Sequence, residues 1–124
     1  MPYLLLPLEA LRAIASGDRA AALAALEQMD VEQEETDPEF LYVVGVWFVQ
    51  VGKHERGLSL IEMAVGRGFF CFPWTVRDAL LDPLRTTAAF QKLLAKVEAR
   101  HRDARAAFSS AGGYEVLALT PSAG

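Results

Sequence analysis

The side chains that carry most enzyme chemistry are scarce in this sequence. It has two histidines, His54 and His101, and one cysteine, Cys71. A metal site needs several histidine, cysteine or carboxylate ligands at short spacings, and neither histidine has a cysteine or a paired acid at such a spacing. We therefore expect no metal, no cofactor and no catalytic residues. A small helical enzyme or ligand carrier remains an alternative hypothesis. It would need a pocket with polar groups, which only His101 near Cys71 could supply.

The same residues have simpler structural interpretations, which we favour. His101 belongs to the apolar stripe of a helix, where a partly buried histidine with a backbone or water partner is the common case. Cys71 stands among Phe69, Phe70 and Phe72, and this setting favours a small apolar filler over a nucleophile. The three phenylalanines either wedge beneath the last helix, which we favour, or form an exposed contact patch.

Three basic residues, Lys92, Lys96 and Arg100, step by four along the last predicted helix and therefore share one face. Such a face suits an acidic or phosphate-bearing partner, or it is simply solvated, which we favour. No aromatic residues interleave with these charges, and the whole chain has a net charge of −4 and a pI near 5.1. These features argue against a nucleic-acid partner.

The chain has 124 residues, 52% of them hydrophobic, which is enough for one domain with a buried core. Residues 1–50 hold nine acids and two bases, whereas residues 85–105 hold six bases and two acids. This asymmetry either attracts chains head to tail or reflects separately solvated faces, which we favour. The N-terminal apolar run has no basic leader, and the longest apolar run, 40–49, is about half of a bilayer span. We expect a cytoplasmic protein without membrane contact.

Polar caps and glycines divide the N-terminal half into helices. An apolar stripe predicts a helix that ends at Gly17, and Asp18 begins an alanine-rich second helix. After a polar acidic loop, Asp37 and the following proline begin a third helix, which Gly52 ends. The expected helices cover about 8–16, 20–29, 38–51 and 54–66.

The C-terminal half predicts one short helix and one long helix. The short helix is expected within residues 73–81, with a second helix start at Asp82-Pro83. A long amphipathic helix is expected over 87–109, and residues 114–119 are expected to be extended. The apolar stripe of the long helix runs through Phe90, Leu94, Val97, His101, Ala104 and Phe108.

Residues 37–65 carry the spacing of one helix-turn-helix repeat. Small residues stand where two paired helices would cross, and larger apolar residues stand beside them. This pattern resembles the tetratricopeptide repeat. Moving the pattern back by 35 residues places Gly52 on Gly17 and Gly45 on Ala10, which indicates a degenerate first copy. The residues expected to pack the repeat are Leu41, Val44, Gly45, Phe48, Gly57, Ile61 and Ala64.

The segment after the repeat narrows the resemblance. It resembles the closing segment of tetratricopeptide regions in bacterial multidomain regulators, where such regions follow Ser/Thr kinase or winged-helix activator domains. The likeness covers roughly residues 6–110, and Phe69 departs from it by replacing the usual closing proline. The sequence has no kinase or DNA-binding motif, so neither activity transfers. The matching residues are Gly68, Phe69, Phe70, Arg77, Asp78, Asp82, Pro83, Leu84, Arg85 and Phe90.

We therefore expect an all-α fold. Two antiparallel tetratricopeptide-like helix pairs would stack as an α-α superhelix, closed by a short helix and a long C-terminal capping helix. Trp47 and Trp74 would be core anchors between neighbouring helices. The expected boundaries are 1–113 for the domain, about 4–36 and 37–70 for the repeats, 73–111 for the capping segment and 114–124 for a flexible tail.

The resemblance implies that the inner face of the 38–51 helix lines a concave groove for a protein or peptide partner. Apolar burial at Tyr42, Val46 and Val49 would supply the affinity. Alternatively, the last helix or a second copy of the chain already covers this face, and the chain is a self-association module that forms a two-fold dimer. The residues assigned to the groove are Glu39, Tyr42, Val46, Val49 and Gln50, with an acidic rim of Glu32, Glu34, Glu35 and Glu39.

Overall fold

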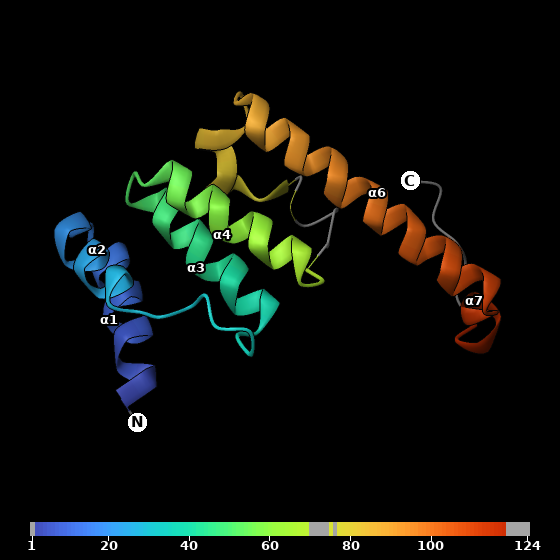
Figure 1. Ribbon diagram of the computed structural model, residues 1–124, viewed down its shortest axis with the longest axis horizontal. Coiled ribbons are helices and arrows are strands. Elements are labelled where there is room, and N and C mark those ends of the chain that lie inside the picture. Colours follow the sequence, from blue (N-terminus) through green and yellow to red (C-terminus); the bar gives the residue numbers. More distant parts are fainter. Residues whose placement is uncertain (1, 70–74, 76, 119–124) are drawn as a thin grey trace.

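The computed structural model describes residues 2–69, 75 and 77–118, and the regular structure within these ranges is helical (Figure 1). This confirms the all-α prediction. The elements are α1 (Pro2–Ser16), α2 (Arg19–Glu27), α3 (Pro38–Gln50), α4 (His54–Gly66), the 3-10 helix η1 (Ala79–Leu84), α6 (Ala88–Ser110) and the single turn α7 (Gly113–Val116).

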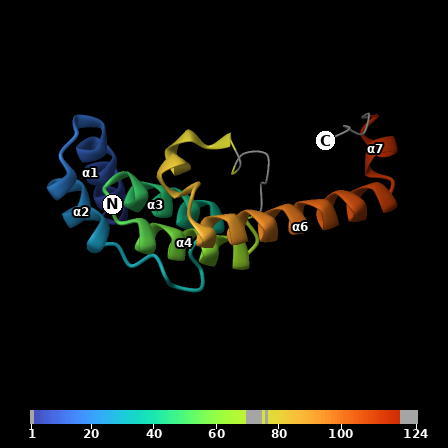
Figure 2. The same cartoon turned by 90° about the horizontal axis from the view of Figure 1, so that it is seen from above.

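Two helix pairs make up the N-terminal part of the molecule. α1 packs on α2, and α3 packs along the whole length of α4 (Figures 1 and 2). α3 also contacts α1, α2 and η1, so it lies at the centre of the packing. This position explains why its sequence is apolar nearly all round, because such a helix must be covered on several sides. The superhelical offset of a tetratricopeptide array stays a prediction.

The starts of α2 and α3 are set by the polar caps that the sequence predicts. The Asp18 carboxylate accepts a hydrogen bond from the Ala21 amide at 3.0 Å and begins α2. Asp37 accepts hydrogen bonds from the amides of Glu39 and Phe40 at the start of α3. These side chains supply acceptors for amides that have no partner inside the first turn.

Two glycines bring the helices of the second pair into close contact, Gly45 of α3 and Gly57 of α4. A Cβ atom added to Gly45 would lie 2.8 Å from the Gly57 carbonyl oxygen, and one added to Gly57 would lie 2.6 Å from the Gly45 carbonyl oxygen. Real Cβ atoms do not approach oxygen this closely, so both positions require glycine. The two backbones therefore touch, and the larger side chains pack on either side of the contact.

α6 has two unlike halves. Its first half is covered, with Phe90, Leu93 and Val97 at 0–4% exposure. After Val97 no residue of α6 is buried, and Phe108 near the end of the helix is 37% exposed. Figure 2 shows this second half running past the edge of the helix pairs. The predicted apolar stripe is therefore a core face only in its first half.

The start of η1 differs from the predicted helix start at Asp82-Pro83. The Asp78 carboxylate accepts a hydrogen bond from the Leu80 amide at 3.1 Å, so η1 begins at Ala79 and Pro83 lies inside it. Proline has no amide hydrogen to donate to the carbonyl of Leu80, one turn earlier. The Gln50 side chain donates to that carbonyl instead, at 3.0 Å.

The C-terminal segment also differs from the prediction. Residues 114–116 belong to α7 and are helical, whereas we expected them to be extended. Gly112, at φ 77°, turns the chain back, and the Tyr114 ring then meets the Phe108 ring edge to face at 4.9 Å. Among the described residues, no helix is both long enough and apolar enough to cross a membrane. Predictions for Phe70, Cys71, Phe72 and Trp74 lie outside the described residues.

Candidate partner-binding groove

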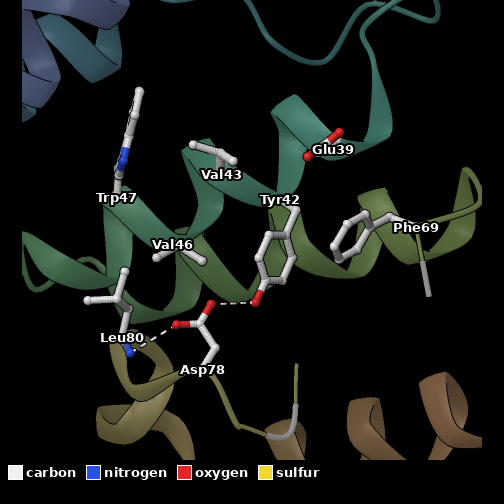
Figure 3. Close-up of a pocket in the computed structure, with 8 residues that line it drawn as sticks. All are labelled: Glu39, Tyr42, Val43, Val46, Trp47, Phe69, Asp78 and Leu80. Atoms are coloured by element: carbon white, nitrogen blue, oxygen red, sulfur yellow. Dashed lines mark hydrogen bonds between the residues drawn. The ribbon is translucent and has the colours of Figure 1, made fainter. Parts of the chain in front are cut away.

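An apolar groove of about 380 Å³ lies on the face of α3 turned away from α4 (Figure 3). Trp47 stands at one end and Phe69 at the other, with Val43, Val46 and Tyr42 between them. Its lining, which we call the α3 groove, consists of Glu39, Tyr42, Val43, Val46, Trp47, Phe69, Asp78 and Leu80.

Tyr42 joins the groove to the segment that precedes η1. Its ring stacks on Phe69 with 4.4 Å between the centroids, and its hydroxyl donates a hydrogen bond of 2.7 Å to Asp78. The other oxygen of Asp78 accepts from the Leu80 amide. One carboxylate thus fixes both the Tyr42 ring and the start of η1, although residues 42 and 78 are far apart in the sequence.

The accessible part of the groove comes from residues on its rim. Tyr42 and Val46 are 4% exposed and form the floor. Val43, Trp47 and Phe69 are only half-buried, and Leu80 is 48% exposed. Glu39 is exposed at the Phe69 end. The result is an apolar surface, still open to solvent, with the Glu39 and Asp78 carboxylates on opposite sides of Tyr42 (Figure 3).

Three of the five residues that the sequence assigned to the groove line it: Glu39, Tyr42 and Val46. Val49 does not, because it stands one turn after Gly45 and packs against Gly57 of α4, so a Cβ added to Gly57 would lie 2.6 Å from a Val49 methyl carbon. Gln50 is held at the margin by its hydrogen bond to the Leu80 carbonyl.

Sequence reasoning missed five lining residues: Val43, Trp47, Phe69, Asp78 and Leu80. Val43 and Trp47 could have been predicted from the sequence, because they share one helix face with Glu39, Tyr42 and Val46. Trp47 also packs against the core, as predicted for an anchor. The other three come from segments distant in sequence, and no periodicity relates them to α3.

The predicted acidic rim is wrong for the 30–36 loop. Glu32 forms an ion pair with Arg56 of α4, and the Arg67 guanidinium donates to the backbone carbonyls of Glu32 and Gln33. These contacts hold the loop along α4, away from the α3 groove. Glu34 and Glu35 border a separate polar hollow beside Arg67. The two carboxylates of the groove are therefore Glu39 and Asp78.

The residues predicted to pack the repeat lie in the interior: Leu41, Val44, Gly45, Phe48, Gly57, Ile61 and Ala64 are all buried. His54 is exposed in the first turn of α4, and His101 is half-buried on α6. Lys92 and Lys96 are exposed, but Arg100 donates a 2.6 Å hydrogen bond to the Val65 carbonyl and so ties α6 to the end of α4. Within the described ranges, no three metal-ligating side chains gather.

Taken together, these observations define an all-helical protein with a solvent-open apolar groove on its central helix. Comparison with protein-family models, curated proteins and solved structures gave no match to this chain.

Proposed function

We propose that this chain is a non-catalytic protein–protein interaction module of the tetratricopeptide type. It would act as a cytoplasmic scaffold or regulatory unit, as the resemblance to bacterial regulators implies. The observation that supports this proposal most directly is the α3 groove, where Val43, Trp47 and Phe69 stay half-buried next to a fully packed floor.

The groove has the composition of a peptide-binding site. Apolar and aromatic side chains dominate its lining, and buried aromatic and apolar contacts supply most of the free energy of protein association. The groove also follows one face of a single helix, so a partner helix can lie along it with apolar residues three or four positions apart. Trp47 and Phe69 at the two ends would limit how far such a helix can slide.

The carboxylates favour a partner of opposite charge. Glu39 is exposed at one end of the groove, and the acidic residues outnumber the basic ones nine to two in residues 1–50. A basic residue one turn away from the apolar anchor would meet Glu39 and fix the direction of the partner. Asp78 contributes negative potential, while both of its oxygens stay engaged with Tyr42 and Leu80.

The test is a selection from a displayed random-peptide library. Peptides are selected on the wild-type chain and counter-selected on Val43→Glu, which places a charge in the groove. Enriched peptides should carry paired apolar residues and a basic residue, and fluorescence anisotropy should show binding at least about 30-fold weaker to Val43→Glu.

The matched control is Glu62→Lys, a charge change at an exposed position of α4, outside the groove. It should leave peptide affinity unchanged. Peptides that bind wild type, Val43→Glu and Glu62→Lys equally would contradict the groove as the binding site. Failure to enrich any peptide that distinguishes Val43→Glu from wild type would contradict the proposed function itself.

Self-association is the second candidate function, and exposed apolar residues at both ends of the molecule favour it. Leu5, Leu8 and Leu11 on α1 are 57%, 63% and 48% exposed, and Val116 in α7 is 81% exposed. Surfaces of this kind often mark contacts between proteins. Sedimentation velocity of wild type and Leu8→Glu tests this second function, because only self-association through these residues predicts an oligomer that the α1 substitution weakens.

A further inference from the structure

The outer face of α1 carries the large apolar residues of that helix, which is the reverse of the usual arrangement. α1 buries small residues, Ala10 and Ala13, against the rest of the chain. Leu5, Leu8 and Leu11 are exposed instead. A helix that serves only its own fold buries its large apolar side chains, so this face has the character of an interface. Figure 2 shows α1 and α2 at the end of the molecule opposite α7, where a second molecule can approach.

Three other exposed residues belong to the same face: Glu9, Arg12 and Ala15. At 3.6 residues per turn, Leu8 lies at the centre of the face with Ala15 beside it. Glu9 and Arg12 both lie on one flank of Leu8. We call Leu5, Leu8, Glu9, Leu11, Arg12 and Ala15 the α1 face.

The charges of the α1 face favour a second copy of the same face as its partner. The face holds one acid, Glu9, and one base, Arg12, so it has no net charge that would attract an acidic or a basic partner. A second copy can supply the opposite charge to each of them. Two antiparallel helices related by a two-fold axis bring the same flank of each helix together, whereas two parallel helices place those flanks on opposite sides of the contact.

The apolar residues fit the same antiparallel register. With Leu8 opposite Leu11 of the second copy, Leu5 falls opposite Ala15 and Glu9 falls opposite Arg12, all within about two residues of one register. The two-fold axis repeats every one of these contacts. Each copy of Ala15 leaves room for Leu5, and both ion pairs flank the leucines on one side.

We propose that α1 packs antiparallel on α1 of a second copy, with leucines at the centre and Glu9 paired with Arg12 of the other copy. This inference rests on self-association, the second function proposed above, and names its surface and geometry. The α1 face lies outside the α3 groove, so the dimer would present two grooves. One helix from each copy makes a small interface, and we expect a dissociation constant of about 10–100 μM.

The test reverses each charge separately and then mixes the variants. In sedimentation velocity, Glu9→Arg and Arg12→Glu should each dimerise about 10-fold more weakly than wild type, because each places like charges opposite one another twice. An equimolar mixture of the two variants should recover wild-type affinity as a heterodimer, since every Arg then faces a Glu. The matched control, Glu62→Arg, is the same charge change at an exposed position of α4 and should dimerise as wild type does.

Circular dichroism melting curves check that the variants fold. A wild type that stays monomeric, or a mixture that does not recover, would overturn the inference. It would also fall if Leu8→Glu weakens association while both charge reversals leave it unchanged, although self-association itself would then stand. The groove's function is judged apart from this, by whether library peptides distinguish Val43→Glu from wild type.

Discussion

The α3–α4 pair and the α6 arm, by which we mean the outer half of α6 with α7 (residues 101–116), both carry apolar residues at helical spacing, but only the pair is covered. In the pair, Gly45 and Gly57 bring two backbones into contact, and the side chains around them are at most 4% exposed. In the arm, the stripe residue Phe108 is 37% exposed. Periodicity alone therefore indicates which face of a helix is apolar, and the surface opposite decides whether that face is buried.

The difference also separates two roles of apolar residues. Burial in the pair removes area from water within the chain and so stabilises the fold. The same residue types in the arm and on the rim of the α3 groove contribute little to folding and remain available for association. A substitution in each region should therefore affect different measurements.

The largest expected contrast is between two phenylalanines of one helix. Phe90→Ala removes a ring at 0% exposure and should lower the free energy of unfolding by about 3–5 kcal/mol. Phe108→Ala should lower it by less than about 1 kcal/mol, because its ring is partly in water. Urea denaturation followed by circular dichroism measures both. Equal losses would show that the arm packs on the domain in solution.

The second contrast tests the glycine contact. Gly57→Ala should destabilise by about 2 kcal/mol, because the new methyl would lie 2.6 Å from the Gly45 carbonyl oxygen and the two helix backbones would have to move apart. Gly66→Ala, in the same helix, is the matched control, because a Cβ atom there meets nothing within 4 Å. Denaturation midpoints that fall equally in both variants would contradict the tight crossing.

Much of this architecture was predictable from the sequence, because it depends on local signals. Asp37, Pro38 and Gly52 set the bounds of α3 within one residue, and the predicted second helix, 54–66, coincides with α4. The spacing of small residues in the sequence also identified Gly45 and Gly57 as the point where the two helices cross. A cap or a close approach restricts the residue type at its own position, and that restriction is readable in one sequence.

The groove was only partly predictable, because its other wall comes from distant segments. The hydrogen bond between Tyr42 and Asp78 joins residues 36 positions apart, and no local sequence pattern predicts it. The loop with Glu32 lies along α4 because arginines of that helix region bind it. Val49 was assigned to the wrong face because it is apolar like its neighbours, although its spacing from Gly45 directs it toward α4.

A smaller contrast concerns the wall of the groove. Tyr42→Phe keeps the stacking on Phe69 but removes the 2.7 Å hydrogen bond to Asp78, and should cost about 1 kcal/mol of stability. Tyr114→Phe keeps its ring contact with Phe108 in the arm and should leave the unfolding midpoint unchanged. If Tyr42→Phe were as neutral as Tyr114→Phe, Asp78 would not anchor η1 through this hydroxyl.

The smallest contrast locates the point where α6 leaves the domain. Arg100 donates to the Val65 carbonyl at 2.6 Å, one turn beyond the exposed Lys96. Arg100→Gln should cost about 0.5 kcal/mol, because its guanidinium is partly solvated and water replaces much of the lost hydrogen bond. Lys96→Gln should cost nothing measurable in urea denaturation. Amide hydrogen exchange then adds the spatial detail: in Arg100→Gln the faster-exchanging amides of α6 should begin about one turn earlier than in wild type. An unchanged exchange profile would show that Val97 alone holds the end of the covered half.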